Sequence, residues 1–137
     1  MKQFLAVFLA IVVGHAIAGE LPPLRETKSS NIGFGTVPEA LASLRARPEV
    51  VEREQQGWLL FKDEPHHTLW SFAPKDHPAF PSAVKRELIE KNGGLYVNMS
   101  VLCGASKKVC DQLVRDFQEL NSQMSQAMRS GQVGQGH

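Results

Sequence analysis

VKRELIEKNGGLYVNMSVLC, residues 84–103, is the stretch that decides the fold. Asn92-Gly93 near its centre is the strongest short signal for a hairpin turn, because both residues tolerate positive φ. Residues 95–101 then alternate apolar and polar side chains, which is typical of a strand. That strand needs a partner just before the turn, so we expect a strand over Val84–Lys91. A helix capped by Ser82, with its apolar residues on one side, is the alternative for this segment.

Three shorter strands are expected before this hairpin. Residues 50–54 and 58–62 flank Gln55-Gln56-Gly57, a plausible tight connection between two strands. Residues 68–72, TLWSF, predict a third strand whose side chains alternate between two faces. Residues 73–81 contain three prolines, which exclude regular structure there. The middle of the chain is therefore expected to be a set of antiparallel strands.

A helix is predicted on each side of these strands. Thr36 and Glu39 form a capping-box pattern at the start of a short helix that Pro48 ends. Ser106 is a suitable N-cap for a much longer one. Apolar residues recur there every three or four positions, which predicts one apolar stripe: Val109, Leu113, Phe117, Leu120, Met124 and Met128.

This order of elements predicts an α+β fold. We expect an antiparallel sheet of about five strands, with a short N-terminal helix and a long amphipathic C-terminal helix packed on one face. The predicted single domain covers residues 36–129. Residues 19–35 are rich in Pro, Gly and Ser and are expected to be a flexible leader, and residues 130–137 a frayed tail.

The first eighteen residues, MKQFLAVFLAIVVGHAIA, have the pattern of a signal peptide. Lys2 precedes an apolar run of about ten residues, too short for the roughly twenty that a membrane-spanning helix needs. Ala16-Ile17-Ala18 supplies the small-x-small cleavage pattern. We therefore expect cleavage near Ala18–Gly19 and a periplasmic or secreted mature chain, with no stable insertion in a membrane.

Cys103 and Cys110 are the two cysteines of the chain. In an exported protein an even count favours a disulfide. Six intervening residues do not match the C-x-x-C spacing of catalytic redox pairs, although a free or redox-active pair is the alternative. A disulfide would join the end of the last strand to the first turn of the long helix.

Titratable side chains give only weak site candidates. His66, His67 and His77 lie in loops on either side of the TLWSF strand and could converge on a metal ion. Adjacent histidines point to opposite faces, however, so we expect neither a metal nor another cofactor. We identify no catalytic residues, because the chain lacks a recognisable catalytic motif, and we do not expect an enzyme. A formal charge of +1 argues against a nucleic-acid partner.

Two exposed features are candidates for binding a protein partner. Lys107 and Lys108 lie in the loop that the predicted disulfide closes, at a helix N-terminus, where basic residues oppose the helix dipole. Phe80 lies between Pro78 and Pro81 on an irregular segment, where it could project from the surface or plug the edge of the sheet. The other aromatic residues are expected in the core.

The segment HPAFPS (77–82), the Cys103/Cys110 pair and the following Asp111 resemble small exported bacterial proteins that have no established function. This resemblance implies a compact extracytoplasmic domain with a disulfide and implies no activity. A disulfide-held loop on a small α+β domain also resembles lysozyme inhibitors of the Ivy type. Their loop is shorter and contains a histidine, whereas the present loop contains lysines, so that likeness is an analogy only.

These observations lead to one functional hypothesis with two alternatives. We expect an exported binding or accessory protein without catalytic activity, whose partner is another extracytoplasmic protein. The first alternative is an inhibitor or immunity-type protein of an extracytoplasmic enzyme. The second is a metal-binding protein that uses the three histidines.

Overall fold

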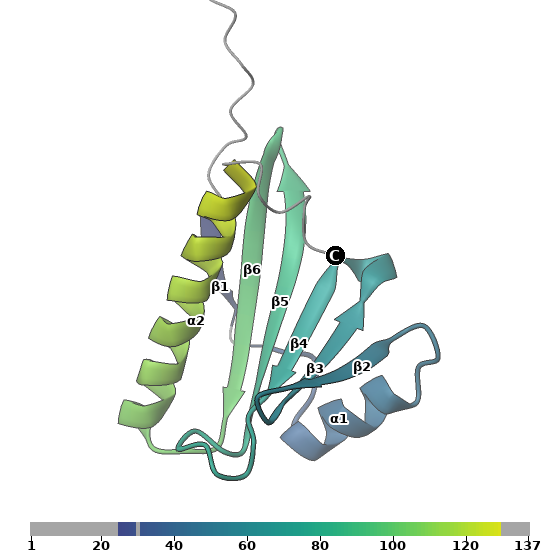
Figure 1. The fold of residues 1–137 in the computed structure, drawn as a ribbon, viewed down its shortest axis with the longest axis vertical. Helices are drawn as coiled ribbons and strands as arrows, with labels where there is room; N and C mark the ends of the chain where they lie inside the picture. Colours follow the sequence, from purple (N-terminus) through teal and green to yellow (C-terminus); the bar gives the residue numbers. More distant parts are fainter. Residues whose placement is uncertain (1–24, 30, 130–137) are drawn as a thin grey trace, which may run out of the picture.

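The computed structural model describes residues 25–29 and 31–129 (Figure 1). The predicted signal peptide, its cleavage site and the predicted C-terminal tail lie outside the described residues. Within them, no helix is both long enough and apolar enough to cross a membrane.

The described chain forms a six-stranded sheet with two α-helices. The strands lie in the spatial order β1-β6-β5-β4-β3-β2, with β1 and β2 at the edges. The elements are β1 (Arg25–Ser29), α1 (Val37–Arg45), β2 (Val51–Gln55), β3 (Trp58–Asp63), the 3₁₀ helix η1 (Glu64–His66), β4 (Thr68–Phe72), β5 (Ser82–Lys91), β6 (Gly94–Cys103) and α2 (Lys107–Arg129).

β5 and β6 form the central hairpin of the sheet. They pair over ten residue positions, from Ser82 with Cys103 to Lys91 with Gly94. Asn92 and Gly93 have φ values of 53° and 75°, which is the backbone conformation of a type I′ turn. The predicted strand over Val84–Lys91 is thereby confirmed.

β2, β3 and β4 continue the sheet as an antiparallel meander. The turn between β2 and β3 uses Gln56 and Gly57, again both at positive φ. Along β4, Trp70 and Phe72 point to one face, while Ser71 points to the other. The predicted alternation of this strand is therefore confirmed.

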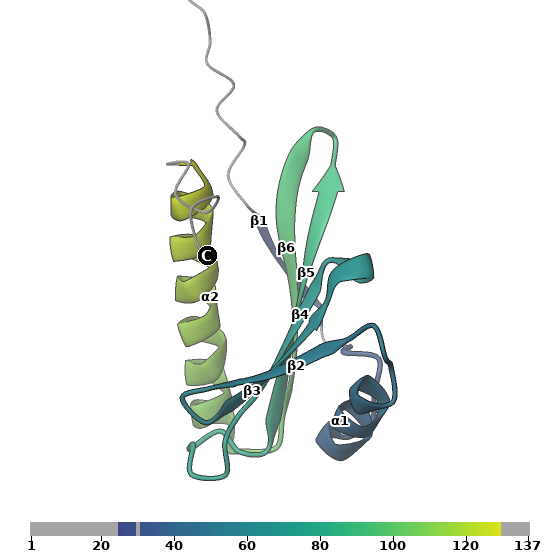
Figure 2. The same cartoon turned by 45° about the vertical axis from the view of Figure 1, so that its right-hand side comes forward.

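The two helices lie on opposite faces of the sheet (Figure 2). α1 packs Ala40 and Leu44 against Phe61, Trp70 and Phe72, in the core of what we call the α1 face. On the α2 face, α2 packs Leu113 and Phe117 against a second apolar cluster, which includes residues of β5 and β6. The α+β class is confirmed, but the expectation of helices on one face is wrong. Both faces of the central strands are apolar, because Ala83 and Val84 each belong to a core, so each face needs a cover.

The predicted flexible leader is also corrected. Its residues 25–29 form β1, which pairs in parallel with β6 from Arg25 opposite Tyr96 to Ser29 opposite Ser100. Ile32 is buried in the core of the α1 face. The physical reason is that β6 has a free edge, and an added strand pairs its backbone groups whatever the polarity of that strand's side chains.

The predicted capping box at the start of α1 is present. The Glu39 amide donates to Thr36 Oγ1, and the Thr36 amide donates to the Glu39 carboxylate, both at 3.2 Å. α2 begins directly after Ser106, whose hydroxyl accepts from the Val109 amide at 3.4 Å. Both helix starts were therefore readable from the sequence.

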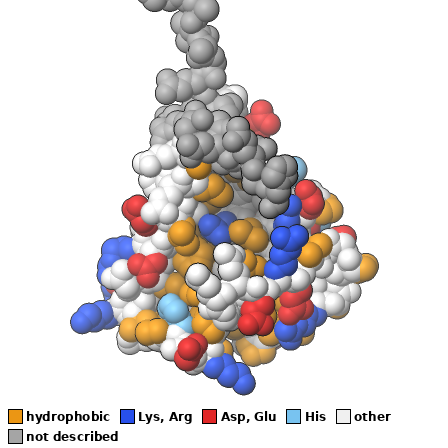
Figure 3. Space-filling view, viewed as in Figure 1, with side chains coloured by type: hydrophobic (Ala, Val, Ile, Leu, Met, Phe, Trp, Pro, Cys, Tyr) orange, Lys and Arg blue, Asp and Glu red, His pale blue; other side chains and the backbone are white. Residues whose placement is uncertain are grey.

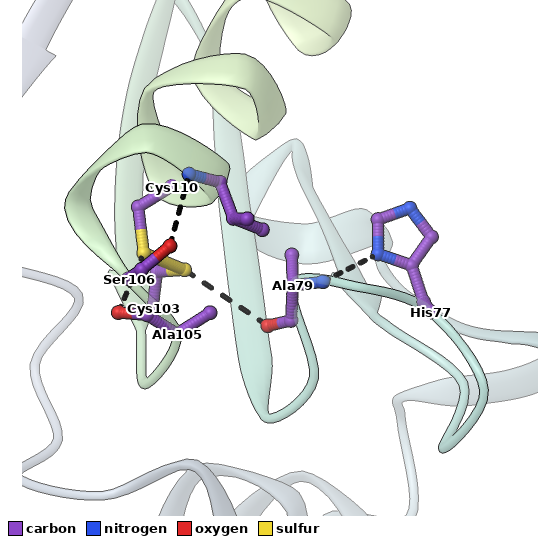
Figure 4. The surroundings of a disulfide bond; sticks show 7 residues. His77, Ala79, Cys103, Ala105, Ser106 and Cys110 are labelled. Atoms are coloured by element: carbon purple, nitrogen blue, oxygen red, sulfur yellow. Dashed lines mark hydrogen bonds between the residues drawn. A yellow bond between two sulfur atoms is a disulfide. The ribbon is translucent and has the colours of Figure 1, made fainter.

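The predicted disulfide joins Cys103 at the end of β6 to Cys110 in α2 (Figure 4). Their Cα atoms are 5.9 Å apart. The proline-rich loop packs against this junction, because the Gly104 amide donates to the Pro81 carbonyl at 2.8 Å. A disulfide is typical of proteins that work in an oxidising, extracytoplasmic environment.

Replacing both cysteines, Cys103→Ser with Cys110→Ser, is expected to lower the free energy of unfolding by about 2–3 kcal/mol. Closing an eight-residue loop removes about that much conformational freedom from the unfolded chain. Urea unfolding of the oxidised protein, the reduced protein and the double variant measures the effect. Reduced and variant proteins should match each other, and equal stability of the oxidised and reduced forms would contradict the prediction.

Candidate functional site

Among the described residues, α2 covers only part of its face of the sheet. α2 packs over β5 and β6, and its closest strand contacts are with β6. β2, β3 and β4 extend beyond the helix on this face, and Figure 1 shows them to one side of it. Trp58, at the start of β3, reaches back to α2, with its ring centroid 5.6 Å from that of Phe117. A groove therefore lies between the helix and the uncovered strands.

Two cavities of about 310 and 320 Å³ form this groove, which we call the α2 groove. Figure 3 shows hydrophobic side chains gathered around a basic one in the middle of this face. Most of the surface that lines the first cavity is apolar. The residues used below are Leu69, Arg86, Leu88, Val97 and Met124 in the first cavity, and Trp58, Leu60, Ser71, Arg86, Phe117 and Leu120 in the second.

Arg86 of β5 lies in the walls of both cavities. Its guanidinium lies over the Phe117 ring, with Cζ 5.2 Å from the ring centroid. Nη1 donates to Asn121 Oδ1 of α2 at 3.2 Å, while Nε is buried without a hydrogen-bond partner among the described residues. Burial lowers the pKa of Arg86, but an arginine stays protonated in proteins. A charged donor thus faces an apolar groove with part of its capacity unused.

The carboxylates around the groove do not neutralise Arg86. Asp63 pairs with Arg47 at 2.8 Å and Glu87 with Lys85 at 2.6 Å. The other two acidic residues of the cavity walls also have partners: Glu64 pairs with Lys62 at 3.5 Å, and Asp116 accepts from Gln112 at 2.7 Å. Among the described residues Arg86 has no ion pair, so an acceptor from outside the chain would not have to displace one.

Ser71 adds a second unsatisfied group to the groove. Its hydroxyl oxygen is buried without a hydrogen-bond partner among the described residues. Leu69 is paired with Arg86 and Ser71 with Val84, so Ser71 and Arg86 are diagonal neighbours on the same face. Such neighbours have Cα atoms about 7–8 Å apart, within reach of a long side chain. Buried polar groups without partners are uncommon in proteins.

Sequence reasoning missed Arg86 and the groove. One signal was present: Val84, Arg86 and Leu88 share one face of a strand, so the alternation places a charged residue among apolar ones. The predicted apolar stripe of α2 did not show the groove either. Leu120 belongs to that stripe yet is 48% exposed, whereas the polar Asn121 beside it is 1% exposed, so the face of α2 that packs on the sheet is rotated from the predicted one.

Lys107, Lys108 and Phe80 lie elsewhere, at the disulfide end of the molecule. Lys107 and Lys108 are exposed in the first turn of α2, and Lys107 donates to Asp111 at 2.7 Å. Phe80 is 42% exposed, so its side chain lies in part at the surface. The Gly104–Pro81 contact brings the two segments close, but none of these three side chains lines the α2 groove.

The three histidines do not converge. His66 and His67 precede β4, whereas His77 follows it, and a five-residue strand separates its two ends by roughly 13–17 Å. The His66 ring is 2.9 Å from Asp63, while His77 Nδ1 accepts from the Ala79 amide at 3.0 Å. Among residues 25–29 and 31–129 no group of three or more His, Cys, Asp or Glu is placed to hold a metal ion.

Asp63 is instead the centre of a polar cluster at the end of β3. It is 3% exposed and binds Arg47 and His66. Burial raises the pKa of Asp63, but the hydrogen bonds from His66 and Arg47 outweigh burial and hold that pKa below its usual value. Through Arg47 and Asp63, the cluster joins the segment after α1 to the end of β3. His66 therefore has a structural partner in Asp63.

Comparison of the chain with protein-family models, curated proteins and solved structures found no match.

Asp63→Asn should change how stability depends on pH. A lowered carboxyl pKa contributes stability that is present above the unfolded-state pKa of about 4 and is lost as pH falls through the folded-state pKa. The wild type should therefore lose more free energy of unfolding between about pH 5 and pH 2 than the variant. Urea unfolding across this range measures the difference.

Glu54→Gln is the matched control, because it removes one carboxylate from an exposed position of β2. This variant should follow the wild-type pH dependence. Parallel pH curves for the wild type and Asp63→Asn would contradict the role of Asp63. Carboxylates such as Glu87, whose pKa is also lowered, titrate in all three proteins and cancel in the comparison.

Proposed function

We propose that this chain is an exported binding protein without catalytic activity, which holds a small apolar ligand in the α2 groove. The observation that carries the proposal is the groove itself. Most of its lining surface is apolar, and Arg86, which has no ion pair among the described residues, lies where its two cavities meet. Cavities of 300 to 1,000 Å³ with apolar walls and few polar groups are typical of small-molecule sites.

Export is the second part of the proposal. It rests on the signal-peptide pattern of residues 1–18, and the disulfide supports it. Export and the groove fit together through the disulfide. An exported protein can form this bond, and the bond holds α2 against the sheet beside the groove. The Cys103–Cys110 bond fixes the start of α2 to β6 and therefore one wall of the groove.

The alternative, an inhibitor or immunity-type protein, would act through the disulfide end of the molecule. Two exposed residues favour this alternative: Phe80 is 42% exposed, and the side chain of Lys107 is 89% exposed. Lys107 is paired with Asp111, however, and Lys108 alone offers little charge to an acidic partner. We therefore rank the α2 groove above this loop as the binding site.

The neutral fluorescent probe N-phenyl-1-naphthylamine is expected to bind the folded protein at one site. Leu88→Gln should weaken this binding by about tenfold, because it removes apolar surface from the groove wall. Fluorescence titration gives the dissociation constant of each protein, and circular dichroism confirms that the variants are folded.

Ile89→Gln is the matched control for Leu88→Gln. The two residues are adjacent on β5 and both are 37% exposed, but they point to opposite faces. Ile89→Gln should leave binding of the probe unchanged. Equal weakening by both substitutions, or absence of probe binding by the wild type, would count against the groove as a ligand site.

A further inference from the structure

We propose that the ligand of the α2 groove is an aliphatic carboxylate, with its acid group at Arg86 and its hydrocarbon chain along the apolar wall beside α2. This inference rests on the proposed function and adds the chemical class of the ligand. Its basis is the juxtaposition of one unsatisfied charged donor with an apolar cavity.

Arg86 has the geometry to bind a carboxylate. A guanidinium offers five N–H donors in a planar fork that matches the two oxygens of a carboxylate. Asn121 accepts one of these donors, and Nε is buried without a partner among the described residues. Every acidic side chain in the cavity walls is already paired with another residue. No carboxylate of the described residues completes Arg86, so we assign that place to the acid group of a ligand.

Asn121 and Phe117 hold the guanidinium in place from the α2 side. Asn121 is 1% exposed and is itself fixed by a contact from its amide nitrogen to Met99 Sδ at 3.6 Å. Phe117 supports the other side of the guanidinium through its ring. A donor that is held in this way loses little freedom when it binds an anion, so part of the entropic cost of binding is already met. Ser71 places a further unsatisfied hydroxyl on the same face.

The size and lining of the first cavity indicate the rest of the ligand. Its volume of about 310 Å³ equals that of about ten water molecules at about 30 Å³ each, which is close to the size of an eight-carbon acid. Leu69, Leu88, Val97 and Met124 line this cavity. Most of the lining surface is apolar, so it favours a hydrocarbon chain over the repeated amide groups of a peptide.

Octanoate and 1-octanol test the inference on the unchanged protein. They have the same hydrocarbon chain and differ in the acid group. Isothermal titration calorimetry, or displacement of the neutral probe, gives both dissociation constants. We expect octanoate to bind about tenfold or more tightly than octanol, because hydrogen bonds to charged groups are among the strongest that proteins make.

Arg86→Met should remove this preference, so that octanoate and octanol bind the variant within about twofold of each other. Arg86→Lys, which keeps the charge but not the planar fork, should retain part of the preference. Arg115→Met is the matched control, because it removes one arginine from an exposed position of α2 and should leave the preference unchanged. If Arg86→Met does not fold, the comparison of the two ligands on the wild type still decides whether the groove prefers a carboxylate, and Arg86→Lys tests the part that Arg86 plays.

Each other outcome overturns a defined part of the inference. Equal binding of octanoate and octanol by the wild type would overturn the carboxylate and leave the groove as an apolar site. A preference that persists in folded Arg86→Met would overturn Arg86 as the group that binds the acid. Tighter binding of a short peptide that ends in leucine would overturn the aliphatic acid in favour of a peptide C-terminus. Failure to bind either octyl ligand, with the neutral probe still bound, would overturn the aliphatic carboxylate and leave the proposed apolar site.

Discussion

The ten-residue pairing of β5 with β6 is the interaction on which the rest of the structure depends. One edge of this hairpin pairs with β4 and the other with β1. Its side chains supply both cores, since Ala83 belongs to the cluster under α1 and Val84 to the cluster under α2. A shift of one residue in this register would exchange the two faces and remove both cores at once.

The groove follows from how the helices share this sheet. α1 packs on one face over β3, β4 and β5, and α2 on the other over β5 and β6. The two helices overlap only at β5, one on each face of the sheet. On the α2 face, neither helix covers β2, β3 and β4. A single helix has a diameter of about 10 Å and strands lie about 4.8 Å apart, so one helix covers only two or three strands of a six-stranded sheet.

Much of the fold could be predicted because its signals are local. Asn92-Gly93 requires positive φ, Thr36 and Glu39 cap a helix, and the alternation over residues 95–101 indicates a strand whatever surrounds it. β1 could not be predicted, because residues 25–29, RETKS, carry no strand pattern and pair only because β6 has a free edge. The separation of His66 from His77 also depends on tertiary structure, since both simply flank one strand in the sequence.

The sequence by itself determined the elements from α1 to α2 apart from η1, their order, the disulfide between Cys103 and Cys110 and the α+β class, because periodicity, turn residues and helix caps act over a few neighbouring positions. Only the tertiary structure decided which face each helix covers, and with it the groove. Arg86 shows the difference. Its place on the strand follows from alternation, but its lack of an anionic partner within the described part of the chain depends on how α2, β3 and β4 pack around it. The nearest carboxylate in sequence, Glu87, pairs with Lys85 instead, and whether another element brings a carboxylate to Arg86 depends on how the elements pack, so a local pattern cannot show that Arg86 is left without an ion pair among the described residues.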